Sequence, residues 1–96
     1  MKQPAVYILA SAPGGRLYTG VTSNLPQRVW QHKNDVIDGH SKTYKIHDLV
    51  YFEMHESMEA AIVREKQIKH WNRDWRIRLI RENNPKWDDL YYKLTL

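Results

Sequence analysis

Two short aromatic segments near the N-terminus, with a turn between them, constrain the fold more than any other feature. Residues 5–9 and 17–21 are rich in β-branched and aromatic side chains. Between them, residues 11–16 hold one proline and two adjacent glycines, which favour a turn. Two β-prone segments around such a loop predict a β-hairpin. In this hairpin, Tyr7 and Tyr18 are expected to lie close together across the strands.

A helix is predicted directly after the hairpin. The side chain of Asn24 can cap it, and Pro26 is tolerated in its first turn. The helix is expected to end near residues 38–39, where a glycine favours termination. Residues 40–47 are polar and basic, and we expect a loop there.

The second half of the chain predicts one strand and two helices. Residues 49–52 form a compact β-prone run. Ser57 is a plausible N-cap for a helix over residues 58–71. A further helix over residues 75–82 ends before a proline at position 85, because the residue before a proline disfavours helical geometry.

Length and composition limit the class of protein. A chain of 96 residues fits one domain, residues 1–96. The order β-β-α-β-α-α predicts the α+β class (an α/β sandwich), with a three-stranded, mainly antiparallel sheet flanked by helices. The absence of cysteine excludes disulfides and thiolate zinc sites. The chain shows no signal peptide or apolar run long enough to span a membrane, so we expect a cytoplasmic protein.

Positive charge is concentrated in one stretch of the chain. Residues 64–81 carry seven basic side chains against two acidic ones, Glu65 and Asp74. This excess indicates a polyanionic partner such as nucleic acid, or alternatively a solvated helix surface.

Three side chains are candidates for chemistry. Glu65 lies among apolar residues at helical spacing, where a carboxylate needs a partner. It is therefore a metal ligand, a general base or one half of a salt bridge to an arginine. Arg28 and His32, four residues apart, share one helix face and could stabilise a phosphoryl transition state and move a proton. The alternative is a surface arginine beside a packing histidine.

The order of these residues resembles the GIY-YIG nuclease superfamily, in particular small single-domain members similar to the endonuclease domain of the DNA-repair excinuclease. The first signature reads Ala-Val-Tyr at residues 5–7, and the second reads Tyr-Thr-Gly at residues 18–20. Ala5 stands in place of the first glycine of the signature. The remaining matches are single residues, namely Arg28, His32, Glu65 and Asn84.

The resemblance implies roles for these residues. It implies one divalent cation, Mg²⁺ or Mn²⁺, held by Glu65, and a clamp on the phosphate by Arg28. Either tyrosine would activate or position the attacking water with help from His32. A free tyrosine has a pKa of about 10, so it needs a nearby cation or metal to act as a base. Asn84 would brace the site, although the adjacent Asn83 leaves the register open by one residue.

The implied activity is hydrolysis of phosphodiester bonds in DNA by an endonuclease. We expect it to select DNA structure rather than sequence, in DNA repair or recombination, with a protein partner supplying further specificity. The basic residues expected to contact nucleic acid are Lys42, Lys45, Lys69, Arg73 and Arg76. The alternative functions are a non-catalytic nucleic-acid-binding module or a protein-interaction partner of a repair complex.

Overall fold

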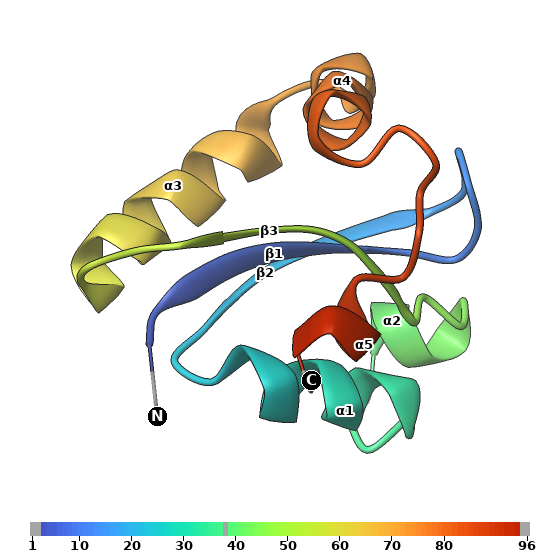
Figure 1. Cartoon of the computed structure of the whole chain (residues 1–96), viewed down its shortest axis with the longest axis horizontal. Helices are drawn as coiled ribbons and strands as arrows, with labels where there is room; N and C mark the ends of the chain where they lie inside the picture. The colour runs from blue at the N-terminus through green and yellow to red at the C-terminus, as the bar shows by residue number, and fades with distance from the viewer. Residues whose placement is uncertain (1–2, 38, 95–96) are drawn as a thin grey trace.

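The computed structural model describes residues 3–37 and 39–94, and it confirms the predicted α+β class. Three antiparallel strands form a sheet in the order β2-β1-β3, with helices on both faces (Figure 1). No helix within the described residues is long and apolar enough to cross a membrane. The strands are β1 (Ala5–Ala10), β2 (Leu17–Thr22) and β3 (Asp48–Met54). The helices are α1 (Leu25–Lys33), α2 (His40–Thr43), α3 (Met58–His70), α4 (Arg73–Asn83) and α5 (Tyr91–Leu94).

Helices α1 and α3 start at the predicted caps, whereas α4 starts at Arg73, two residues earlier than predicted, and α1 ends early. The side chain of Asn24 accepts a hydrogen bond from the Gln27 backbone N–H at 3.3 Å, as expected for an N-cap. Helix α1 then ends at Lys33 rather than near residues 38–39, because Asp35 adopts a positive φ of 53° that no α-helix accommodates. Residue 38 lies outside the described residues. The segment predicted as a loop contains the short helix α2.

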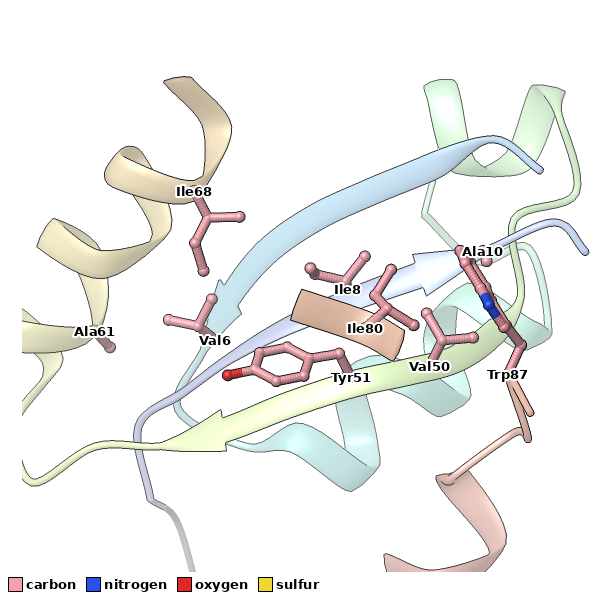
Figure 2. Close-up of a cluster of buried hydrophobic side chains, with 9 residues drawn as sticks. All are labelled: Val6, Ile8, Ala10, Val50, Tyr51, Ala61, Ile68, Ile80 and Trp87. Atoms are coloured by element: carbon pink, nitrogen blue, oxygen red, sulfur yellow. The ribbon is translucent and has the colours of Figure 1, made fainter. Parts of the chain in front are cut away.

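Strand β1 is buried on both faces and separates two apolar cores. Val6, Ile8 and Ala10 pack against α3 and α4, where Ala61, Ile68 and Ile80 meet them (Figure 2). The alternate side chains, which include Tyr7 and Leu9, point to the opposite face with α1 and α5. This period of two explains why one strand supplies both cores.

A β-bulge in β3 fits this strand to both layers. Ile8 pairs with Tyr51, whereas the next residue, Leu9, pairs with Leu49, so Val50 is the extra residue. As a result, Val50 and Tyr51 are consecutive yet both join the core beneath α3 and α4 (Figure 2).

The C-terminal segment is tied to the α1 side of the sheet. The Asp89 carboxylate accepts a hydrogen bond from the Leu49 backbone N–H at 3.1 Å and pairs with Lys33 of α1. The Leu90 N–H also donates to the Leu49 carbonyl at 2.7 Å. These bonds hold α5 beside α1.

Candidate active site

A close approach between Tyr7 and Gly20 defines the floor of the candidate site. The two residues are directly paired across β1 and β2. A Cβ atom at position 20 would lie 2.4 Å from the Tyr7 hydroxyl oxygen and 2.5 Å from Cζ. Only glycine therefore lets the Tyr7 ring lie across the edge strand β2.

Three rings gather above this floor, contributed by β1, β2 and α1. The ring centroids of Tyr7 and Tyr18 are 6.3 Å apart, as expected from the hairpin. The His32 ring lies 5.7 Å from Tyr7 and 5.0 Å from Tyr18. A buried hydrogen bond of 3.0 Å joins the Tyr7 hydroxyl to His32 Nε2. The tyrosine side chains of β1 and β2 thus both lie against the face of α1 that carries His32.

Burial keeps the central pair neutral at physiological pH. Loss of solvent raises the pKa of Tyr7 to about 12, although the nearby Arg28 guanidinium works in the opposite direction. Burial, and then the positive charge of Arg28, lower the pKa of His32 to about 4. In the folded protein at physiological pH, Tyr7 therefore keeps its hydroxyl proton and the His32 imidazole is uncharged.

Arg28 presents one donor without an acceptor among the described residues. Its Nη1 atom donates to Gln31 Oε1 at 3.4 Å, within the same helix. Its Nε atom is buried and has no hydrogen-bond partner among the described residues. A buried guanidinium N–H without an acceptor is costly, and an anionic oxygen at this position would satisfy it.

Glu65 lies on α3, on the other side of the sheet, and its charge acts on Tyr7 from there. Helix α3 packs against β2 and β1, and the Glu65 carboxylate is close enough to raise the pKa of Tyr7. Its side chain is only 13% exposed and pairs with Lys69 at 3.3 Å, rather than with an arginine. Arg64, the neighbouring arginine, instead pairs with Glu53 at 2.7 Å.

The donor set suits a loosely held hard cation. Within the described ranges, no group of three or more histidine, cysteine, aspartate or glutamate side chains could enclose a metal ion. A metal ion held by Glu65 would therefore not be enclosed by protein side chains within these ranges. Mg²⁺ commonly binds in this manner, through one or two carboxylates, with water and phosphate oxygens completing its shell. The residues present fit such an ion.

Asn84 is placed away from these groups, at the C-terminal cap of α4. Its Nδ2 atom donates to the Val50 carbonyl at 3.0 Å and to the Asp88 carbonyl at 2.9 Å. Its Oδ1 atom accepts from the Asp88 N–H at 3.1 Å. Asn83, in contrast, is exposed and donates to Leu79 within its own helix. Of the two asparagines, Asn84 is the one that braces the fold, through β3.

The basic residues expected to contact nucleic acid fall into two groups. Lys42 and Lys45 lie in and after α2, on the α1 side of the sheet, whereas the others lie on the α3 and α4 side (Figure 1). Lys69 is the ion-pair partner of Glu65. Arg73 donates from Nη2 to the carbonyls of residues 14 and 15, both at 2.6 Å. Arg76 is half-buried, and its Nε lacks a partner within the described residues.

Gly20 is part of the second signature, but its close approach to Tyr7 was not among the sequence-based predictions. Its signal was present, because a glycine inside a strand often marks a close backbone approach. The hairpin register places this glycine opposite Tyr7.

Comparisons with known proteins agree with this geometry. The family model of the GIY-YIG catalytic domain matches residues 3–78. A UPF0213 protein of Staphylococcus aureus strain Mu3 / ATCC 700698 is 36% identical over 77 residues, which cover 80% of this chain and 93% of that protein. UPF0213 proteins of strains N315 and MW2 match with the same identity and coverage. No solved structure gives a significant match. The chain therefore belongs to the GIY-YIG catalytic domain family.

Proposed function

We propose that the chain is a divalent-metal-dependent endonuclease that hydrolyses phosphodiester bonds in DNA. The observation that carries the proposal is the clustering of Tyr7, Tyr18, Arg28 and His32 at the edge strand β2, with the Glu65 charge acting on Tyr7 from α3. These side chains come from four elements on both sides of the sheet. Together they supply hydroxyls, a fixed cation and a carboxylate, which phosphodiester hydrolysis requires.

Arg28 would hold the scissile phosphate. Its buried Nε has no acceptor among the described residues and can donate to a non-bridging oxygen. The guanidinium is planar and always charged, so it can stabilise the negative charge that grows on these oxygens in the transition state.

Tyr7 and His32 would position the attacking water. With a pKa of about 12, Tyr7 carries its proton at neutral pH, and the hydrogen bond to His32 fixes the direction of its hydroxyl. The Tyr7 side chain is only 1% exposed, so its oxygen would accept a hydrogen bond from the attacking water only after substrate binding admits water to this buried pair. Tyr18, beside the His32 ring, offers a second hydroxyl on the same side.

Glu65 would hold one Mg²⁺ or Mn²⁺ ion. Such an ion, when bound, stabilises the charge on the phosphate and on the leaving oxygen. The small donor set leaves coordination positions for water and substrate oxygens. Lys69 would have to leave the Glu65 carboxylate or share it with the cation, because both compete for the same oxygens.

We propose a cytoplasmic enzyme that selects DNA by structure rather than by sequence, in repair or recombination, with a protein partner adding specificity. Basic side chains on both sides of the sheet, Lys42, Lys45 and Arg76 among them, support contact with the phosphate backbone. Such contacts carry no sequence information and weaken as salt rises.

Cleavage of plasmid, single-stranded and branched DNA with Mg²⁺ or Mn²⁺ tests the proposal. Glu65→Gln and Arg28→Ala should each reduce the rate by roughly 100-fold or more, as expected when a charge-stabilising group is lost. Glu59→Gln is the matched control, because Glu59 is an exposed carboxylate on the same helix. Equal cleavage by wild type and Glu65→Gln would refute the mechanism. DNA binding without cleavage in all variants would instead support the non-catalytic module.

A further inference from the structure

A second feature lies outside the candidate site, in a groove where the C-terminal end of α3 meets α4. The groove is lined by Trp71, Trp75, Arg78, Leu79 and Glu82. Its walls combine two indole rings and an aliphatic side chain with one cation and one carboxylate. None of these side chains belongs to the tyrosine, arginine and glutamate cluster at β2.

The two tryptophans differ in their packing. Trp71 is half-buried against the core, and the Arg64 guanidinium lies 5.1 Å from its ring centroid. Trp75 packs edge-to-face on Trp71, with centroids 6.0 Å apart, yet 53% of its surface is exposed. Trp71 thus packs between the core and Trp75, and Trp75 exposes part of its ring surface to solvent.

The backbone beneath Trp75 is also held in place. The Trp75 N–H donates to Asn72 Oδ1 at 3.0 Å in the N-terminal cap of α4. A supported aromatic ring with few free torsions loses little conformational entropy on binding. An exposed tryptophan kept in this manner is suited to receive a flat ligand.

The charges around the groove favour an anionic ligand. Helix α4 carries four arginines against Asp74 and Glu82. Arg78 is in the groove itself, where it can contact a phosphate, and the Glu82 carboxylate can accept a hydrogen bond from an N–H group on the edge of a base, such as the imide N–H of thymine. An aromatic surface beside basic side chains is the combination that binds single-stranded nucleic acid.

We propose that this groove binds an unpaired nucleobase of single-stranded DNA, stacked on Trp75. The inference rests on the proposed function and deepens it, because it names the unpaired strand as the part of the substrate that the chain holds. Duplex DNA would bind less well here, since its base faces are covered by their neighbours in the stack. Trp71 follows Glu65 by six residues, a rise of roughly 9 Å in a helix, so the groove lies near the candidate site without being part of it.

Binding of a labelled oligothymidine in EDTA, measured by fluorescence anisotropy, tests the groove separately from cleavage. Trp75→Ala should raise Kd roughly 5- to 150-fold, the range measured for loss of one stacked base. Trp75→Phe keeps an aromatic face and should lose less. Trp30→Ala is the matched control, because Trp30 is 50% exposed but lies on α1. Its Kd should equal that of the wild type.

The salt dependence of the same binding tests the role of Arg78. Arg78→Gln should lower the slope of log Kd against log salt by roughly 0.7, as expected for one lost phosphate contact on a single strand. Lys93→Gln, an exposed cation on α5, should leave the slope unchanged.

The outcomes separate the two proposals. If Trp75→Ala binds oligothymidine as tightly as the wild type, or if the wild type prefers a hairpin duplex, the groove does not hold a base. If the wild type binds no oligothymidine, the inference also fails, whether or not plasmid DNA is cut. If binding depends on Trp75 but no DNA is cleaved, the base-binding role of the groove is supported and the proposed nuclease activity is refuted.

Discussion

The contact between Gly20 and Tyr7 makes Gly20→Ala the most informative single substitution in this chain. The added methyl would lie 2.4 Å from the Tyr7 hydroxyl oxygen, 2.5 Å from Cζ and 2.9 Å from Cε1. Carbon atoms in contact are normally about 3.5–4.0 Å apart. The ring therefore has to move by roughly 1 Å, but it is only 1% exposed and is flanked by Tyr18 and His32.

Three contributions set the size of the effect. Overpacking a buried site costs about 1–3 kcal/mol, and loss of the hydrogen bond between Tyr7 and His32 adds about 0.5–1.5 kcal/mol. Replacing a strand glycine by alanine also stabilises the folded state by about 0.5–1 kcal/mol, because alanine loses less backbone entropy on folding. The net loss is about 0.5–4 kcal/mol of unfolding free energy, which lowers Tm by roughly 2–30 °C in a domain of this size.

Thermal melting and NMR titration of the histidine ring check this expectation. If the Tyr7 ring moves away, water reaches His32 and its pKa rises from about 4 toward the ordinary value of 6.5. A double-mutant cycle with Tyr7→Leu supplies the control, because a shorter side chain removes the clash. Gly20→Ala should then cost little in the Tyr7→Leu background. An equal cost in both backgrounds, or a stable Gly20→Ala protein with an unshifted histidine pKa, would refute the reasoning.

Two further predictions concern His32 and Asn84. The unfolded chain protonates His32 below pH 6.5 while the folded protein keeps it neutral down to about pH 4, so this residue alone should remove up to about 3 kcal/mol of stability as pH falls through that window. Urea unfolding of wild type and His32→Gln at several pH values measures this difference, and parallel pH profiles would contradict it. Asn84→Ala should cost about 1–3 kcal/mol, because it leaves the buried Val50 carbonyl without its donor. Asn83→Ala, at an exposed position, should change stability by no more than about 0.5 kcal/mol; equal losses would argue against the bracing role of Asn84.

The local features of the fold were predictable because their causes are local. The caps at Asn24 and Ser57 depend on backbone N–H groups three residues away. The hairpin depends on the turn residues and the β-prone segments beside it. The face shared by Arg28 and His32 follows from their spacing of four residues.

Other features depend on contacts between distant segments and could not be predicted in this way. The extra residue Val50 in β3 is set by the need to fill two cores at once. The early end of α1 follows from the positive φ at Asp35, whose carboxylate bonds His47 at 2.8 Å. The partner of Asn84 lies 34 residues away on β3. The spacing of residues along the chain does not directly indicate the bulge, the helix end or the partner of Asn84.

The position of the candidate site at the edge strand ties its geometry to the stability of the whole domain. Tyr7 and Val6 are neighbours on β1, yet Tyr7 points to the site and Val6 to the core beneath α3. Strand β1 is buried on both faces, so the Tyr7 ring is held by a rigid element. The Glu65 charge acts on this ring from α3, which is docked on the opposite face of the sheet. A substitution that loosens α3, such as Ile68→Ala in the core, should therefore separate the carboxylate from the hydroxyls before the sheet itself unfolds.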